Sequence, residues 1–396
     1  MSAHRFEPPP ELRPLIARVD AVARESGMSV YAVGGTVRDI LLGRRLRDLD
    51  VAVSGDALSF ARRLASSLDA HFVELDDENG VARIVLPHAD APLHHIDVAA
   101  LRGTLEDDLR RRDFTIDAMA APLTGGELLD PMRGADDLSA GGVRMTSAAA
   151  FEADPLRLLR GARVACELRF EVEPETAHEV RRRAADLRAS AAERQRDELA
   201  HMLALPDAHG GLRLLDRLGL LDVLLPELAT GRGVSQPPDY HAFDVFEHNM
   251  RAVEAMDLIL DGADPARAWI PDTVWGAFRG REEELRAYLG EELSEGRRRA
   301  ALLKLASLLH DAGKPATRTV DADGRIRFFG HADAGARTAR AVMRRLRFSA
   351  REVEFVGVLV EQHLRPVQLA QVGQAPSKRA LYRFARALGD ALPAVL

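Results

Sequence analysis

Cysteine and lysine are scarce in this sequence, and both absences narrow the class of protein. Cys166 is the only cysteine among 396 residues, which excludes an internal disulfide and is typical of a protein kept in a reducing cytoplasm. Lysine occurs only at positions 304, 314 and 378, so arginine supplies nearly all of the positive charge. The planar guanidinium group suits phosphates and base edges, but a GC-rich genome produces the same bias. Only the positions of the arginines can distinguish a binding role from the effect of base composition.

Long apolar segments are also absent. No run approaches the roughly 20 apolar residues that a membrane-spanning helix needs. The first residues, MSAHRFEPPPELRP, carry proline and acid where a signal peptide has an apolar stretch. We therefore expect a cytoplasmic protein without a membrane partner. A chain of 396 residues is long for one core, which favours two or more domains, and the net charge of −7 argues mildly against a chain coated for nucleic acid.

The first 145 residues alternate short β-type runs with helical patterns, which predicts an α/β head with a small mixed sheet. After about residue 150 helical periodicity dominates, which predicts an all-α neck and body. We assign residues 1–148 to the head, 149–230 to the neck and 240–396 to a further helical domain, with 231–243 as the linker.

Two aspartates, Asp48 and Asp50, lie one residue apart in the predicted strand RDLDV. Side chains at positions i and i+2 of a strand point to the same face, so the two carboxylates share a face while Leu49 and Val51 face the core. Like charges this close are unfavourable unless a cation lies between them, and Mg²⁺ prefers carboxylate oxygens and substrate phosphates. Taken alone, such a doublet is more often a solvated strand edge. Whether it is a metal site must therefore be judged from the residues around it.

A glycine pair, Gly34 and Gly35, precedes the doublet and lies between a predicted strand and a predicted helix. Backbone N–H groups at such a turn can hold phosphate, and Arg38, one helical turn later, adds a charged fork. Asp97, in the predicted strand HIDVAA, would supply a third carboxylate. Two metal ions clamped by three carboxylates would activate a hydroxyl group and stabilise a pyrophosphate leaving group.

Three stretches resemble, in the right order, successive motifs of the class II tRNA nucleotidyltransferase and bacterial poly(A) polymerase family: GGTVRDILLG with RDLDVAV, TLEDDLRRRDFTIDAMA, and DPLRLLRGARVACELRF. The resemblance implies that Asp48 and Asp50 bind Mg²⁺ and direct the attack of an RNA 3′-hydroxyl on the α-phosphate of CTP or ATP. It also implies that Gly35, Arg38 and Arg112 bind the nucleotide.

The chain departs from the family pattern at three places. Asp117 stands where asparagine is common, and Ala153 stands where many members have glutamate. The stretch 97–104 is short, and a short loop here is a feature of relatives that add only CC. Complete CCA addition, CC-only addition and poly(A) synthesis therefore remain open.

The segment DPLRLLRGARVACEL predicts an amphipathic helix that starts at Asp154. Arg157, Arg160 and Arg163 lie on one side of it, with Glu167 as the only acid. An anionic partner would therefore relieve the repulsion among the arginines. The resemblance implies that Asp154 and Arg157 pair with the edge of the incoming base without a nucleic-acid template, and that Arg160 and Arg163 support nucleotide binding.

The segments FEHNM, LLHDAGKP, FFGHADAGA and LVEQHLRP look like an HD-type domain, in which histidines and aspartate gather around a divalent metal. The adjacent His310 and Asp311, together with His248, are the sharper ligand candidates, and His331 and His363 are less distinctive. Imidazole with carboxylate suits transition metals as well as Mg²⁺. HD enzymes usually take a last aspartate from a later helix. No counterpart is evident here, which leaves a substituted ligand, a structural domain or a truncated chain as alternatives.

These observations predict a Mg²⁺-dependent enzyme that adds CMP and AMP from CTP and ATP to the 3′ end of tRNA. The helical body would hold the acceptor stem by its shape and phosphates. The alternative of another class is an HD-type metal-dependent phosphohydrolase whose head only binds nucleotide. The sequence makes no prediction of oligomeric state.

Overall fold

The computed structural model describes residues 5–87, 93–237, 242–261, 280–294, 296–370 and 375–395. The chain forms two compact units. The first holds residues 1–157 and 169–179, and the second holds 158–168 and 180–396. Within the described ranges, the helices are all too short or too polar to cross a bilayer.

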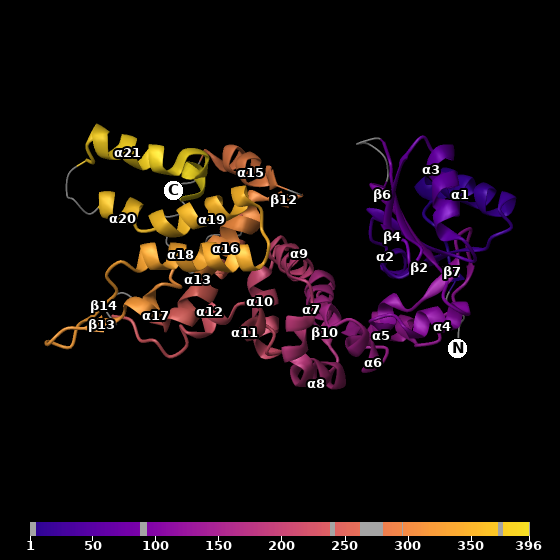
Figure 1. Cartoon of the computed structure of the whole chain (residues 1–396), viewed down its shortest axis with the longest axis horizontal. Coiled ribbons are helices and arrows are strands. Elements are labelled where there is room, and N and C mark those ends of the chain that lie inside the picture. The colour runs from indigo at the N-terminus through magenta and orange to yellow at the C-terminus, as the bar shows by residue number, and fades with distance from the viewer. Residues whose placement is uncertain are drawn as a thin grey trace. The chain divides into compact units, whose positions relative to one another are not determined.

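The first unit is built on a six-stranded mixed sheet in the order β4-β5-β6-β3-β2-β7. Strands β2, β4, β6 and β7 are labelled in Figure 1. Strands β3 and β6 are parallel, and the other neighbouring pairs are antiparallel. The strands are β2 (Val30–Val33), β3 (Asp48–Val53), β4 (His71–Asp76), β5 (Val81–Val85), β6 (His95–Ala100) and β7 (Ala120–Pro122). The predicted mixed sheet is therefore confirmed. Sequence periodicity did not predict β4, one of the two edge strands.

The two faces of this sheet differ in character. Leu49, Ile96, Ile84 and Phe72 lie opposite one another on neighbouring strands, on the side where helix α3 (Ala57–Ser67) packs. Leu49, Ile84 and Ile96 are buried there. The alternate residues, which include the aspartates of β3, point to the other face because side chains alternate along a strand.

The other elements of the first unit are short and surround the sheet. They are β1 (Arg5–Phe6), α1 (Arg13–Glu25), α2 (Gly35–Leu41), α4 (Leu105–Arg110), β8 (Gly126–Glu127), α5 (Gly134–Ala140), β9 (Gly142–Val143), α6 (Ala149–Ala153) and β10 (Glu171–Val172), with single 3₁₀ turns at Pro10–Leu12 and Thr115–Asp117. Helix α2 contacts both β2 and β3, which sets the glycine turn beside the strand that carries the doublet.

Helices α7 (Leu156–Leu168) and α8 (Pro174–Arg183) each have residues in both units. The second unit is mainly helical, as predicted. Its further helices are α9 (Ala192–Leu203), α10 (Ala208–Arg217), α11 (Leu221–Leu224), α12 (Pro226–Ala229), α13 (Val245–Asp261), α15 (Glu282–Gly290), α16 (Arg299–Leu309), α17 (Lys314–Thr317), α18 (His331–Arg345), α19 (Ala350–Gln362), α20 (Arg365–Ala370), α21 (Lys378–Leu388) and α22 (Leu392–Val395), with 3₁₀ turns at Ala184–Ala189 and Gly389–Ala391. Helices α13, α16, α18 and α19 pack against one another (Figure 1).

Two small antiparallel strand pairs interrupt this helical unit and were not predicted. They are β11 (Glu292–Ser294) with β12 (Arg297–Arg298), and β13 (Thr319–Val320) with β14 (Ile326–Arg327). The predicted linker, 231–243, lies partly outside the described residues, as does the predicted boundary at residue 240. Its described part includes a residue packed against the helical unit, because Gln236 is buried and accepts a hydrogen bond from Lys314 at 2.6 Å.

Candidate functional site

The aspartate doublet lies at the start of β3 with the alternation that the sequence predicts. Leu49 and Val51 are buried in the core, while Asp48 and Asp50 are partly exposed on the opposite face. The backbone N–H of Asp50 donates a 2.7 Å hydrogen bond to Thr36 Oγ1, on the buried side of α2. Thr36, which the sequence did not single out, therefore ties the glycine-turn helix to the doublet.

The oxygens of the doublet fit a hard divalent cation. Oδ1 of Asp48 is buried and accepts no hydrogen bond within the described part of the chain; His95 Nδ1 lies 2.9 Å away, but not in hydrogen-bonding geometry. Burial, and next the charge of Asp97, raise the pKa of Asp50 to about 6, while Arg112 opposes the shift. A buried acceptor beside crowded carboxylates is costly unless a positive ion satisfies it.

The glycine turn lies against these carboxylates and against an arginine. Gly34 has φ +60°, and a Cβ added there would lie 2.7 Å from Arg112 Nη1. A Cβ added at Gly35 would lie 3.4 Å from Asp50 Oδ2 and 3.4 Å from Arg38 Nη2. The two glycines therefore keep side chains out of the space between the doublet and two guanidinium groups, the place where the sequence predicts a bound phosphate.

Arg38 and Arg112 differ in how fully they are paired. Arg38 is buried and donates to Asp117 at 2.7 Å and to Asp39 at 2.9 Å. Arg112 reaches Asp117 O and Asp108 Oδ2 only at 3.4 and 3.5 Å, and its Nε is buried without an acceptor in the described structure. Arg112 is thus the more available cation, and Arg38 has a structural partner that the sequence did not predict.

Asp97 lies directly opposite Asp50, because β3 and β6 pair in that register. Both of its oxygens are already engaged: Arg83 on β5 donates from Nε to Oδ1 and from Nη2 to Oδ2, each at 2.8 Å. His95 Nε2 lies 3.6 Å from Asp97 Oδ2. Asp97 is therefore next to the doublet as predicted, but as a carboxylate held by Arg83 rather than as a vacant ligand.

The residues at the start of α7 contact the segment that carries Arg112. Asp154 Oδ1 accepts a hydrogen bond from the backbone N–H of Leu156 at 3.1 Å, which confirms its role as a cap. Arg157 Nη1 donates to Arg111 O at 3.0 Å and to Ala150 O at 3.3 Å. Nε of Arg157 is buried and has no acceptor within the described residues.

Arg160 and Arg163 do not need an added anion to relieve their repulsion, contrary to the expectation from the sequence. Glu198 on α9 is buried and accepts from Arg160 Nε at 3.2 Å and from Arg163 Nε at 2.5 Å. Glu167 accepts from Arg163 Nη1 at 2.7 Å. The missing acid lies 35 residues away from Arg163 in the chain, where helical periodicity gives no signal.

In the second unit, four histidines gather around one buried aspartate. Nε2 of His248 and of His310 lie 3.3 and 3.1 Å from Asp311 Oδ2. Nε2 of His331 and of His363 lie 3.3 and 3.7 Å from Asp311 Oδ1. The two histidines that looked less distinctive in the sequence are thus part of the same cluster, and Asp311 belongs to two groups with metal-ligand spacing.

The ring orientations in this cluster suit metal binding. Three of the histidines donate from Nδ1, at 2.7 Å, to the carbonyl three residues earlier: His310 to Ser307, His331 to Phe328 and His363 to Val360. A carbonyl only accepts, so each Nδ1 carries the proton and each Nε2 faces the aspartate. Burial, and next the charge of His310, lower the pKa of His363 to about 4, which keeps that ring neutral.

Two atoms of the cluster show that a cation fits it. Asp311 Oδ1 and His331 Nε2 are buried and make no hydrogen bond within the described residues. Imidazoles that bind metals commonly donate one ring N–H to a backbone carbonyl, as these do from Nδ1, and coordinate with the other nitrogen. Lys314, which the sequence reading passed over, is buried and lies with its Nζ 2.7 Å from Asp311 Oδ2.

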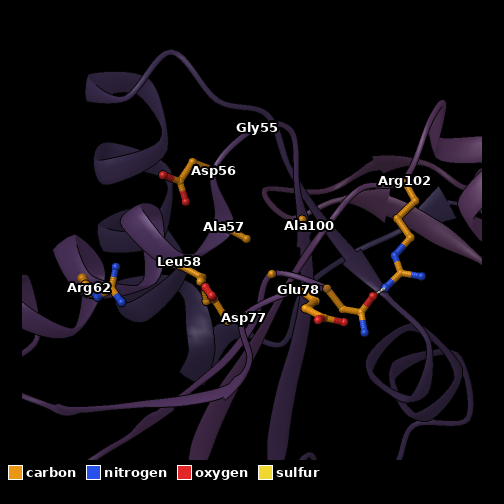
Figure 2. A pocket seen from close by; sticks show the side chains of 11 residues that line it. Gly55, Asp56, Ala57, Leu58, Arg62, Asp77, Glu78, Ala100 and Arg102 are labelled. Carbon is orange, nitrogen blue, oxygen red and sulfur yellow. Dashed lines mark hydrogen bonds between the residues drawn. The ribbon is translucent and has the colours of Figure 1, made fainter.

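Figure 2 shows a separate hollow of about 500 Å³. The doublet is at the start of β3, whereas the hollow lies beyond the end of that strand. Its lining includes Gly55 after β3, Ala100 at the end of β6, and the turn that carries Glu78. Asp56 at its edge accepts from the backbone N–H of Ser59 and caps α3. The hollow is therefore distinct from the carboxylate site and lacks the crowded, unsatisfied acceptors found there.

Comparison with known proteins gives three family matches along the chain. Residues 30–144 match the Poly A polymerase head domain. Residues 169–231 match the probable RNA and SrmB-binding site of polymerase A, and residues 283–390 match the HD domain.

Several curated relatives align with most of the chain. An A-adding tRNA nucleotidyltransferase of Deinococcus radiodurans is 37% identical over 370 residues, which are 92% of this chain and 74% of that protein. A CC-adding tRNA nucleotidyltransferase of Thermus thermophilus is 35% identical, over 92% of this chain and 73% of that one. A multifunctional CCA protein of Neisseria meningitidis serogroup C is 34% identical, over 89% and 76%.

Solved structures share the fold. The apo form of a tRNA-processing enzyme superposes with a TM-score of 0.67 at 21% sequence identity, covering 99% of this chain and 89% of that one. At this identity the likeness concerns the fold, and it agrees with the α/β head and helical body described above.

Proposed function

Because the chain belongs to the tRNA nucleotidyltransferase and bacterial poly(A) polymerase family, we propose that it adds CMP and AMP from CTP and ATP to the 3′ end of tRNA. The observation that carries the proposal is the buried, unsatisfied Oδ1 of Asp48 beside Asp50, next to a side-chain-free glycine turn. In the proposed step, the terminal 3′-oxygen of the RNA bonds to the α-phosphorus. The bond from that phosphorus to the β-bridging oxygen breaks, pyrophosphate leaves with the electron pair, and the hydroxyl proton passes to solvent.

The residues of the head divide this work. Asp48 and Asp50 would hold Mg²⁺, and a bound Mg²⁺ supplies positive charge that stabilises the attacking and leaving oxygens. The hydrogen bond from Asp50 to Thr36 keeps the doublet in place. Arg112 lies beside Gly34 with unsatisfied donor capacity, so we assign it to the triphosphate. Gly35 has no side chain, which leaves space for the triphosphate beside Asp50 and Arg38.

Arg38 and Asp97 take supporting parts in this proposal. Arg38 is paired with Asp117. We therefore propose that it acts as a fixed positive charge beside Gly35 and does not bind the phosphate with both arms of its guanidinium group. Asp97, held by Arg83, adds negative charge beside Asp50.

Base selection is assigned to Asp154 and Arg157 from the motif match. Arg157 is held by two backbone carbonyls yet keeps a buried, unsatisfied Nε, which a base edge can satisfy. Arg160 and Arg163 are proposed as supports of nucleotide binding on the motif match alone. Their pairing with Glu198 also makes them part of the framework.

The nucleotides added are proposed to be C, C and A. The relatives' names include A-adding, CC-adding and multifunctional CCA proteins, so one assay must separate these outcomes. Residues 101–104 alone connect β6 to α4, and a link this short is the feature that favours CC-only addition. The test is to incubate the protein with Mg²⁺, tRNA lacking CCA, and CTP or ATP or both, and to resolve products at single-nucleotide length.

The variant Asp48→Asn should abolish extension in that assay, because it removes a charged ligand. The exposed Asp69→Asn is the matched control on the same unit and should behave as wild type. If wild-type protein extends no tRNA with any nucleotide mixture, or if Asp48→Asn extends it normally, the proposal fails.

For the histidine–aspartate cluster we propose a divalent transition metal. Four inward imidazoles around one carboxylate suit such an ion better than they suit Mg²⁺, which prefers oxygen ligands. Elemental analysis of protein purified without chelators should find close to one equivalent of metal or more, and His310→Ala should lose it. A full chain without bound metal after exposure to Mn²⁺, Ni²⁺ or Zn²⁺ would contradict the assignment.

A further inference from the structure

The sheet face that carries the doublet continues across β6, β5 and β4. The strand registers place Asp50, Asp97, Arg83 and Val73 in one row across the four strands. A second row runs from Asp48 through His95 to Val85. Residues opposite one another in register share a face, so Arg83, Val73 and Val85 lie on the same side of the sheet as the doublet.

The outer part of this face is exposed and apolar around a fixed arginine. Val73 is 41% exposed and Val85 is 38% exposed, on neighbouring strands. Arg83 lies directly opposite Val73 and two residues before Val85 on β5, with 39% of its side chain exposed. Its Nε and Nη2 are held side-on by Asp97 at 2.8 Å each, which fixes the guanidinium plane and leaves Nη1 on the opposite edge.

The chemistry of the proposed reaction requires two substrates on opposite sides of the α-phosphorus, because the attacking and leaving oxygens are in line. The leaving pyrophosphate belongs beside Gly34 and Arg112, at the end of β2. In the sheet order β4-β5-β6-β3-β2-β7, strand β2 is on one side of the doublet and β6, β5 and β4 are on the other. The RNA terminus must therefore approach over the strands that carry Asp97 and Arg83.

We infer that Arg83, with Val73 and Val85, is the platform for the 3′-terminal nucleotide of the RNA. The inference rests on the proposed function and assigns the acceptor side of that same site. Single-stranded bases stack on arginine guanidinium planes, and stacking tolerates any base. Such tolerance suits an enzyme whose RNA terminus changes after each addition. Arg83 is a positioning residue in this scheme, and the two valines contact the terminal ribose and base.

The test measures KM for tRNA lacking its end separately from KM for CTP. Val73→Ser with Val85→Ser leaves the Arg83–Asp97 pair intact and should raise KM for tRNA by about five-fold or more, the scale of losing a stacked base, while KM for CTP stays within about two-fold. Arg83→Ala should do the same and also lower kcat, because it releases Asp97. Arg62→Ala is the matched control: Arg62 pairs with Glu74 and lies over Phe72 on the opposite face, and both KM values should stay unchanged.

A second measurement uses the unaltered protein. A tRNA that ends in 4-thiouridine should photo-crosslink to peptides of β4 and β5. Crosslinks confined to other segments, or valine and arginine variants that change KM for CTP and leave KM for tRNA unchanged, overturn the platform while the proposed function stands. Wild-type protein that does not extend tRNA at all overturns the proposed function and the platform with it.

Discussion

Arg38 and Asp117 form a nearly buried ion pair, with Arg38 Nη1 2.7 Å from Asp117 Oδ1. The pair joins α2, which begins at the glycine turn, to the 3₁₀ turn Thr115–Asp117 that follows the arginine-rich motif. The ion pair therefore holds the glycine turn and the arginine-rich motif in fixed positions beside the doublet.

Removing one partner of this pair should destabilise the head. Asp117→Ala leaves Arg38 buried without its strongest acceptor, and we expect the free energy of unfolding to fall by about 3 kcal/mol. Asp117→Asn keeps an acceptor and should cost less. The exposed pair Arg133–Asp136 gives the control, since Asp136→Ala should cost under about 1 kcal/mol. Urea denaturation of the full chain checks this, and equal losses for Asp117→Ala and Asp136→Ala would show that the pair is not structural.

Thr36 should affect the reaction through Asp50. Thr36→Val removes the acceptor of the Asp50 N–H at nearly unchanged volume, so a buried donor is left unsatisfied at a cost of about 1–3 kcal/mol. The doublet would also lose its fixed position, and we expect the extension rate to fall about ten-fold or more. Thr36→Ser keeps the hydroxyl and should restore most of the rate. A Thr36→Val enzyme with the wild-type rate would refute the coupling of α2 to the doublet.

Glu198 should be the more sensitive member of the arginine cluster on α7. Glu198→Ala leaves both Arg160 and Arg163 without their shared acceptor, and we expect a loss of about 3 kcal/mol in the free energy of unfolding. Glu193 lies on the same helix, is exposed, and reaches Arg347 only at 3.9 Å. Glu193→Ala should therefore change stability by less than about 0.5 kcal/mol. Thermal melts of both variants make the comparison, and a Glu198→Ala protein as stable as wild type would contradict the assignment of Glu198 as the structural partner of these arginines.

Removing single histidines should lower the metal content of the histidine–aspartate cluster. His331→Ala and His363→Ala should each lower metal content, because both rings face Asp311 Oδ1 with Nε2. Chelation should lower the melting temperature of wild type, because an ion bound only by the folded state stabilises it, and should leave those variants less affected. His201→Ala, at an exposed position on α9, is the control and should keep the metal. Unchanged metal in both cluster variants would contradict the ligand set.

The two sites should act independently. His310→Ala should leave tRNA extension intact in Mg²⁺ buffer, and Asp48→Ala should leave the metal content of the cluster unchanged. Any phosphate release that needs the cluster should be lost in His310→Ala and kept in Asp48→Ala. Loss of both properties in either variant would contradict a two-site protein.

The single cysteine should react slowly and with a marked pH dependence. Burial, followed by the charge of Asp207, raises the pKa of Cys166 to about 11 from 9.0. The thiolate is the reactive form, so the alkylation rate should rise about ten-fold per pH unit between pH 7 and 10 and level off only near pH 11. Iodoacetamide labelling followed by mass spectrometry measures this. Protein unfolded in urea is the reference, and it should react much faster at pH 8; equal rates would show that Cys166 is not shielded.

Much of the candidate site could be predicted from the sequence because its signals are local. The two-residue period of a strand places Asp48 and Asp50 on one face, and the structure shows this alternation. The adjacent His310 and Asp311 mark the metal cluster in the same way. The order of the motifs also predicts the α/β head before the helical body.

The partners of these residues could not be predicted, because they come from distant parts of the chain. Nothing near Arg38 in the sequence indicates Asp117, 79 residues away, and nothing near Asp97 indicates that Arg83 on the next strand occupies both oxygens. Glu198 reaches the arginines of α7 only because α9 packs beside them.

The sequence by itself therefore determined which chemical groups the protein has and which of them share a strand or helix face, because backbone periodicity acts over a few residues. The tertiary structure alone decided which groups are neutralised and which remain unsatisfied. Charge pairing depends on distances of 3 to 4 Å across elements, and only the packing of strands and helices sets those distances. It left Arg112 Nε, Asp48 Oδ1 and Asp311 Oδ1 without hydrogen-bond partners in the described part of the chain. It paired Arg38, Asp97, Arg160 and Arg163 with partners within the fold.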